Sequence, residues 1–381
     1  MDIMSGVFRS RPALRWLVPT AAAVVVIGGG AAAGTIAASA DPTLPERSAA
    51  QLLVDVQSAK VDGLSGTVVQ TADLGLPALP GVTGGSGSGA DLMKLVSGSN
   101  TARVWYAGED KVRLALLGTL GETDVIRNGT DVWTWRSSDN SAVHAKIPAD
   151  ALTKKDKALP AGVPQTPQEA ADAALAAVGP STAVTTTGAA KVAGRDAYEL
   201  VLTPKDAASL VGQVRLAIDG EKHIPLGVDV YAKGVDTPAL RIAFQQVSFE
   251  TPDPEQFVFT PPAGTKVTEP STAELEKQHG SLGDKAAADA KAKGEGTKVV
   301  GEGWTSVLVA TLPKEDGGST AGKGADTAQL DAITNSLPKV SGTWGSGRLL
   351  QSALFSALLT DDGRVLVGAV APEKLYEAAG K

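Results

Sequence analysis

The chain has no cysteine among its 381 residues, few aromatic residues and only three histidines. Without cysteine it can form no disulfide, thiolate metal site or cysteine nucleophile, and it cannot carry a lipid on an N-terminal cysteine. Phe, Trp and Tyr together make up 4% of the residues, so a core must be built mainly from Val, Leu, Ala and Ile. His144, His223 and His279 lie in separate segments and form no His-x-x-x-His pair. The sequence therefore predicts neither a metal site nor a cofactor.

Catalytic motifs are also missing. No Gly-x-Ser-x-Gly elbow of an α/β-hydrolase occurs in the chain. The Ser-x-x-Lys spacing of Ser336 and Lys339 contains Pro338, which disfavours the helical turn that this motif needs. Because no nucleophile stands with a base, the sequence predicts that the protein is not an enzyme.

The charge balance argues against nucleic acid as a partner. The formal net charge is −7, although Arg9, Arg11 and Arg15 make the first forty residues net positive. The rest of the chain is therefore more acidic than the whole, whereas phosphate binding needs a basic surface.

The N-terminus carries an export signal. Three arginines precede an apolar run over residues 16–38, which is long enough as a helix to cross a hydrocarbon core. The positive flank should stay in the cytoplasm, so everything after Asp41 is expected outside it. Two alternatives stay open. The run anchors the protein in the cytoplasmic membrane, or it is a signal peptide cleaved near Ala40, after Ala38-Ser39-Ala40.

Strand patterns fill the chain between residues 43 and 268. A short helix is expected first, over Thr43 to Lys60, and strands then follow at the short spacing of an antiparallel sheet. Asn128-Gly129 is a hairpin signal because both residues tolerate positive φ. The eleven expected strands are Ser65–Thr71, Thr101–Ala107, Lys111–Leu117, Thr123–Arg127, Asp131–Arg136, Ala142–Ile147, Ala183–Thr187, Ala197–Thr203, Gln213–Asp219, Leu226–Ala232 and Leu240–Phe249.

Three of these strands alternate apolar with polar residues. Such alternation gathers the apolar side chains on one face of the sheet and the charges on the other. The apolar sets are Val112, Leu114 and Leu116, then Val214, Leu216 and Ile218, then Leu240, Ile242 and Phe244. One clear helix interrupts the strands, opened by the capping box Thr166-Pro167-Gln168-Glu169 and continuing to Val178. Its small residues favour close packing on the sheet, as a plug or lid.

A second, smaller module is expected near the C-terminus. Residues 269–297 are poor in large apolar residues and are interpreted as a linker. The following residues, 298–381, predict an α+β domain. Its expected strands are Val299–Leu312, Leu349–Leu359 and Arg364–Val370, and its expected helices are Thr327–Leu337 and Pro372–Ala379.

Five motifs in order resemble the LolA/RseB superfamily of periplasmic lipoprotein carriers and their relatives, over residues 47 to 268. They are Asp131-Val132-Trp133-Thr134-Trp135 after Asn128-Gly129, then Tyr198 to Pro204, Val214 to Asp219, His223 to Val228, and Phe257 to Gly264. The C-terminal module, with Val365 to Pro372 followed by a helix, resembles the smaller second domain of RseB-like proteins. The resemblance implies a mainly β fold, namely a curved, half-open antiparallel barrel of about eleven strands with a plug helix and a small α+β domain.

The resemblance also implies a function. Such proteins hold acyl chains of lipids or lipoproteins in an apolar cavity outside the cytoplasm, and they supply no catalytic residues. The alternative is an RseB-like regulatory module that binds a membrane-bound partner of the anti-sigma type through its C-terminal domain. The cavity candidates could equally be ordinary core, and the two tryptophans either a cavity wall or a core anchor. These candidates are Leu114, Leu116, Val125, Trp133, Trp135, Val214, Leu216, Ile218, Leu240, Ile242 and Phe244.

Overall fold

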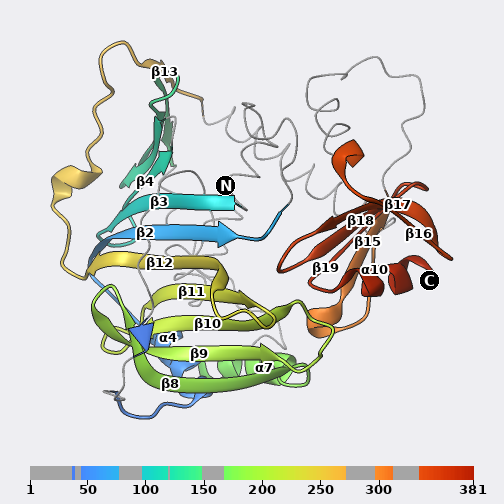
Figure 1. The fold of residues 1–381 in the computed structure, drawn as a ribbon. Coiled ribbons are helices and arrows are strands. Elements are labelled where there is room, and N and C mark those ends of the chain that lie inside the picture. The colour runs from blue at the N-terminus through green and yellow to red at the C-terminus, as the bar shows by residue number, and fades with distance from the viewer. Residues whose placement is uncertain are drawn as a thin grey trace.

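The computed structural model describes residues 37–38, 44–76, 97–118, 121–147, 167–271, 297–311 and 334–381. Within these ranges the chain forms two sheets, a large curved one and a smaller one beside it, and their strands are antiparallel except for one pair (Figure 1). The expectation of a mainly β protein with two parts is confirmed. The expected boundaries at residues 1–40, 43–268, 269–297 and 298–381 stay predictions.

The large sheet has thirteen strands in the order β1-β8-β9-β10-β11-β12-β2-β3-β4-β5-β6-β7-β13. All eleven strands expected from the sequence are present. Two short strands, β1 and β13, extend the two ends, which do not pair with each other in the described residues, so the sheet is a half-open barrel. The strands are β1 Ala37–Ala38, β2 Leu64–Asp73, β3 Ser97–Tyr106, β4 Lys111–Gly118, β5 Gly121–Asn128, β6 Asp131–Arg136, β7 Ser141–Lys146, β8 Thr182–Val192, β9 Arg195–Pro204, β10 Val211–Asp219, β11 Pro225–Ala232, β12 Pro238–Ser248 and β13 Lys266–Thr268.

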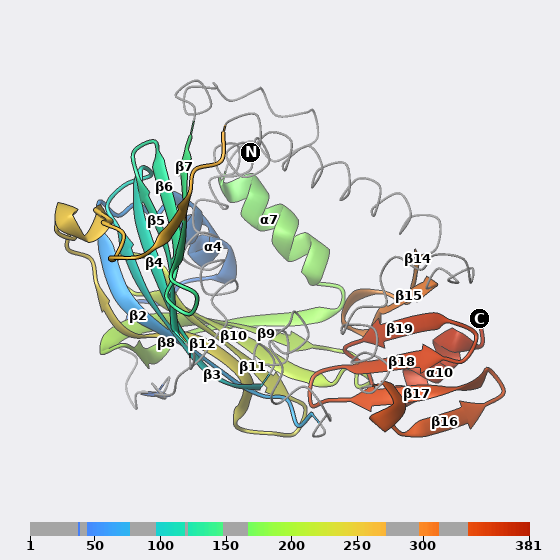
Figure 2. The ribbon, with the colours of Figure 1, turned by 90° about the horizontal axis from the view of Figure 1, so that it is seen from above.

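Two helices lie inside the curve of this sheet (Figure 2). Helix α4, Ala49–Ser58, begins with a capping box in which Ser48 and Gln51 satisfy each other's backbone N–H groups. It packs on the sheet through Leu52, which is fully buried with Leu200 and Ile218. Helix α7, Pro167–Val178, lies next to α4 and confirms the predicted helix. The concave face of the large sheet is therefore partly covered by the chain itself.

The opposite, convex face carries charged residues, as the alternation predicts, but several of them are buried. Asp229 is fully buried beside Arg241, and Glu199 is nearly buried beside Arg215. The pKa of both carboxyl groups is raised, because burial raises it by more than the neighbouring arginines lower it. The guanidinium of Arg215 also lies 4.9 Å from the ring centre of Tyr231. Arg215 and Arg241 thus lie beside the buried carboxyl groups of this face.

A segment between β12 and β13 crosses the convex face. It contains the 3-10 helix η1, Pro254–Phe257, and lies outside the curve of the sheet (Figure 2). Phe257 is 1% exposed, and the Arg113 side chain donates a hydrogen bond to the carbonyl of Gln256 at 3.3 Å. The segment ends in β13, which pairs with β7 in parallel. We call residues 254–271 the outer strap.

The smaller sheet has six strands in the order β14-β15-β19-β18-β17-β16. Helix α10, Pro372–Ala379, packs on one of its faces through Leu375, which is fully buried with Leu358 and Leu366. Helix α10 and strand β19 confirm the prediction. The strands are β14 Thr297–Val300, β15 Val307–Thr311, β16 Lys339–Gly342, β17 Gly345–Gln351, β18 Ser356–Thr360 and β19 Arg364–Gly368.

Two of the strands expected in this sheet were wrong in extent. Val299–Leu312 is not one strand, because the chain turns at Gly301 and Gly303, both at positive φ, and at the 3-10 helix η2, Gly303–Thr305. Leu349–Leu359 is also a hairpin, whose turn is closed by Ser352, which donates to the carbonyl of Phe355 at 2.9 Å. Strand β16 was not predicted. Most of the expected helix Thr327–Leu337 lies outside the described residues.

In the described part of the chain, hydrogen bonds join the two sheets at three places. The backbone N–H of Ala353 donates to the carbonyl of Leu74 at 2.7 Å, and that of Leu210 donates to Ala369 at 2.9 Å. The indole N–H of Trp304 donates to the Thr182 hydroxyl at 2.8 Å. The ends of several strands of the large sheet therefore dock on one side of the small sheet (Figure 1).

The N-terminal prediction falls mainly outside the described residues. Of the apolar run 16–38, only Ala37 and Ala38 are described, and they pair with β8 as β1. Among the helices in the described ranges, none has the length and apolar character needed to cross a membrane.

Candidate functional site

The concave face holds a continuous row of apolar side chains across six strands. Residues directly opposite each other in antiparallel strands share a face, so the register identifies this row. It comprises Val184, Leu202, Val214, Val230, Leu240 and Ala72, from β8 through β12 to β2. All of these except Ala72 are only half-buried. We call this set the first concave row.

A second concave row runs beside the first. It comprises Leu200, Leu216, Val228, Ile242, Gln70 and Asn100, from β9 to β3. Leu216, Val228 and Ile242 are half-buried, so accessible apolar surface continues from the first row into the second. The row ends in a buried polar pair, in which the Asn100 amide donates to the Gln70 carbonyl. The apolar floor therefore has a polar end at β2 and β3.

The far arm of the concave face is more open. Leu114 lies opposite Val125, which lies opposite Thr134 and then Val143 on β7. Val125 and Val143 are each 38% exposed, an unusually high value for valines in a sheet interior. Leu116 lies two residues from Leu114 and shares its face. This arm leaves apolar surface that the described chain does not cover.

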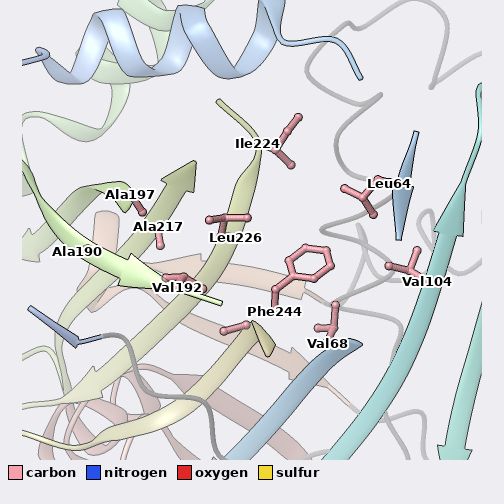
Figure 3. Packing of buried hydrophobic residues seen from close by; sticks show 11 residues of the cluster. Leu64, Val68, Val104, Ala190, Val192, Ala197, Ala217, Ile224, Leu226 and Phe244 are labelled. Carbon is pink, nitrogen blue, oxygen red and sulfur yellow. The ribbon is translucent and has the colours of Figure 1, made fainter. Parts of the chain in front are cut away.

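Two cavity candidates are core residues instead. Ile218 is fully buried under α4, and Phe244 is 5% exposed. Figure 3 shows Phe244 among side chains of the same cluster, which include Val68 and Leu226. Gly66 permits this packing, because a Cβ there would lie 2.8 Å from the Phe244 ring. These two positions are filled by the protein itself.

Trp133 and Trp135 do not lie on the concave face, so their assignment to a cavity was wrong. Trp133 is directly opposite Ile126, one residue out of phase with the pair of Val125 and Thr134. The tryptophans therefore point to the convex side, where Phe259 of the outer strap packs on them at ring-centre distances of 5.2 and 6.1 Å. The sequence contained the signal for this placement, because a two-residue turn at Gly129 and Thr130 fixes that register.

Several residues of the concave rows were missed from the sequence. Val228 and Val230 lie between predicted candidates, and Val184 and Leu202 lie beyond Val214 on the same face. Gln70 and Asn100 were missed because a single polar residue inside a strand carries no pattern of its own. Among the candidates, the structure brings together Val214, Leu216, Leu240 and Ile242 on one side, and Leu114, Leu116 and Val125 on the other.

Leu240 connects the concave face to the small sheet. It packs against a cluster that contains Leu74 of the large sheet together with Leu354 and Phe355 of the β17–β18 turn. A groove of about 520 Å³ lies close to this cluster, lined by Gly75, Pro338, Leu349, Gln351, Ser352 and Ala353. The first concave row therefore ends where the two sheets meet.

In the part of this face that the structure describes, the two concave rows bring no acid, base or metal ligand together. Within the described ranges, no three His, Asp or Glu side chains are grouped as metal ligands. The concave rows consist of aliphatic side chains and one amide pair. Such a surface can bind an apolar group by excluding water, and its own residues offer nothing to transfer a proton or form a covalent bond.

The fold and this face define a class of protein, a half-open β-barrel with an apolar interior and a second, smaller sheet. No family model and no curated protein matches the chain. Among solved structures, the MucA/MucB complex of Pseudomonas aeruginosa is similar at 16% identity and a TM-score of 0.39, over 87% of this chain and 96% of that one.

A second similar structure is the LolA superfamily protein NE2245 of Nitrosomonas europaea, at 12% identity and a TM-score of 0.21, over 56% of this chain and 99% of that one. A third is an uncharacterized conserved protein from Thermus thermophilus, at 11% identity and a TM-score of 0.32, over 59% of this chain and all of that one. The matches include the kinds of protein that the sequence motifs resemble. Because identity and TM-score are this low, any function rests on the residues of this chain.

Proposed function

We propose that the chain is an extracytoplasmic, non-catalytic binding protein that holds acyl chains of lipids or lipoproteins on the concave face of its half-barrel. The observation that carries this proposal is the pair of concave rows, whose apolar side chains except Ala72 and Leu200 are only half-buried although helices lie over the same face. Water-accessible apolar surface inside a curved sheet is costly, and an apolar guest would remove that cost.

The dimensions and energies support an acyl chain as the guest. Neighbouring strands lie about 4.8 Å apart, so the first concave row, which crosses five strand intervals, is roughly 24 Å long. Burying one methylene is worth about 0.8 kcal/mol, so ~14 methylenes offer roughly 11 kcal/mol before the costs of binding. No charged contact is needed to collect this energy. The polar pair of Gln70 and Asn100 ends the neighbouring second concave row, where an ester or amide head could hydrogen-bond.

The N-terminal run gives the proposed location. We propose that residues 16–36 either anchor the protein in the cytoplasmic membrane or form the apolar part of a cleaved signal peptide. A helix of about 21 residues reaches roughly 31 Å, which still spans a hydrocarbon core. Since Ala37 and Ala38 already belong to the sheet, an anchored form would hold the half-barrel directly at the membrane surface.

Acyl binding is tested with protein that begins at Ala37, so that β1 is kept. Native mass spectrometry should detect co-purifying lipid, and a fluorescent fatty acid should bind to delipidated protein. The double variant Val214→Thr, Val230→Thr places two hydroxyls on the first concave row and should weaken binding of the fatty acid at unchanged fold. Protein that is always empty and does not bind the probe would remove the proposal.

A second proposed function is the capture of a membrane-bound protein partner by the small sheet. The observation that favours it is an apolar row on the face opposite α10, formed by Val299, Leu308, Val367, Ala357 and Leu350. Val299 is 60% exposed and Leu308 46%. A variant with Leu308→Asp should lose partner capture in a pull-down and keep fatty-acid binding. If capture persists, this face is not the partner site.

A further inference from the structure

His144 lies between two carboxylates on the convex side of the half-barrel. Its Nε2 is 2.8 Å from Oδ1 of Asp131 on the neighbouring strand β6. Its Nδ1 is 3.2 Å from Oε1 of Glu269, which follows β13 in the outer strap. Both ring nitrogens therefore face an acceptor.

The imidazole ring of His144 is held in this position by a neighbouring aromatic side chain. It stacks on the indole of Trp133 with ring centres 4.1 Å apart and an angle of 3° between the planes. Only 14% of the His144 side chain is exposed, against 40% for Asp131 and 70% for Glu269. Among the described residues, Lys146 adds a further charge to this cluster, with its ammonium 3.9 Å from the Asp131 carboxylate. A fixed ring with two anionic neighbours cannot turn away from either of them without losing the stack.

The protonation state decides how many of these contacts are favourable. A neutral imidazole has one N–H and one lone pair, so it can donate to only one of two carboxylates. The imidazolium has an N–H at each nitrogen and can donate to both at once. The observed geometry therefore suits the protonated ring, and the neutral ring would turn a lone pair toward one of the carboxylates.

The contact with Glu269 lies at the end of a short and exposed strand. All three residues of β13, Lys266 to Thr268, are exposed, and they pair with only half of β7. Before β13, Asn140 accepts a hydrogen bond at its carbonyl from the Lys266 N–H at 2.9 Å. After β13, the described chain continues only to Ser271 before the stretch that leads to the small sheet. His144 thus adds a side-chain contact at Glu269, directly after the end of β13.

We propose that His144 is a proton-dependent clasp: its protonated ring joins Asp131 to Glu269 and so holds β13 on the edge of β7. The geometry determines which protonation state closes the clasp. The clasp is closed while the ring of His144 is protonated and both carboxylates are ionised, and it is lost when the ring becomes neutral. Release of β13 frees the edge of β7 and shifts the point at which the chain leaves the half-barrel for the small sheet.

The first test follows the three histidines of the full chain by proton NMR as the pH is varied. His144 is assigned by its loss in His144→Phe, which keeps an aromatic ring on Trp133 and has no proton to exchange. The titration midpoint of His144 should move to lower pH in Glu269→Gln and again in Asp131→Asn. The matched control is Glu255→Gln, which changes another exposed glutamate of the outer strap and should leave the midpoint where it was.

The second test measures hydrogen exchange of the peptide that contains residues 266–271, at matched intrinsic exchange rates. Protection should increase at least several-fold below the midpoint in the native sequence, and should be independent of pH in His144→Phe and Glu269→Gln. Equal midpoints in all variants, or equal protection in the native sequence and His144→Phe, would overturn the proposal. Thermal unfolding of each variant shows whether the rest of the sheet is intact.

Discussion

Replacing Val125 with aspartate places a carboxylate on the open arm of the concave face without emptying the core. Val125 is 38% exposed, so the change should mainly reduce the affinity for a guest that covers the exposed part of the side chain. Complete burial of a valine is worth about 1.5–3 kcal/mol, and 38% of that value is about 0.6–1.1 kcal/mol. A guest that covers this surface would bind about 3- to 7-fold more weakly once the apolar contact is lost, since 1.36 kcal/mol corresponds to a factor of ten.

The carboxylate adds a second cost, because it must keep its water or be buried without a partner. The measured weakening should therefore exceed the sevenfold given by lost apolar contact alone. The assay is titration of a fluorescent fatty acid into delipidated protein that begins at Ala37. The matched control is Val299→Asp, which makes the same change on an exposed strand of the small sheet, where Val299 is 60% exposed. That variant should bind the fatty acid normally.

The result that refutes the reasoning is an unchanged affinity in a folded Val125→Asp protein. It would mean that no guest reaches the arm formed by β4 and β5, and that Leu114 and Val125 are merely an incompletely covered sheet surface. A weakening of equal size in Val299→Asp would also count against it, because the effect would then follow from net charge. Equal melting temperatures of the two variants make the comparison valid.

Three further predictions concern stability. Leu52→Ala should lower the free energy of unfolding by about 2–5 kcal/mol, measured by urea denaturation, because Leu52 is fully buried under the sheet. Burial raises the pKa of Asp219, but hydrogen bonds from Arg195 and from two backbone N–H groups outweigh this effect, so the pKa is lowered overall. Asp219→Asn should therefore lower the free energy of unfolding by about 3 kcal/mol at neutral pH. This difference between variant and native protein should shrink as the pH falls below about 3.8. Burial raises the pKa of Glu199, so ionisation of this side chain opposes folding as the pH rises above about 4.5. Glu199→Gln should therefore flatten the dependence of the melting temperature on pH in that range. A steeper dependence would contradict a raised pKa of Glu199.

Local sequence patterns determined the strands of the large sheet. The alternation in Lys111–Leu117 and Gln213–Asp219 places every second side chain on one face whatever the surroundings, and both segments are strands in the structure. Turn residues fixed the hairpins in the same local way, as at Gly129 with its φ of 62°. In the small sheet the same reasoning was wrong where apolar residues continued through a turn. Residues 349–359 therefore gave one expected strand where the chain forms a hairpin.

The sequence by itself determined eleven strands of the large sheet, the two helices of the half-barrel and the separation into apolar and charged faces, because each depends on neighbours along the chain. The tertiary structure alone decided which apolar residues stay accessible. Ile218 and Val214 lie on one strand and are indistinguishable by pattern, yet α4 buries the first and leaves the second half open. The same holds for His144, an isolated histidine in sequence, which acquires its two carboxylates only when β6 and the outer strap meet over β7. Coverage and such pairings come from contacts between segments far apart in the chain, and no local period encodes those contacts.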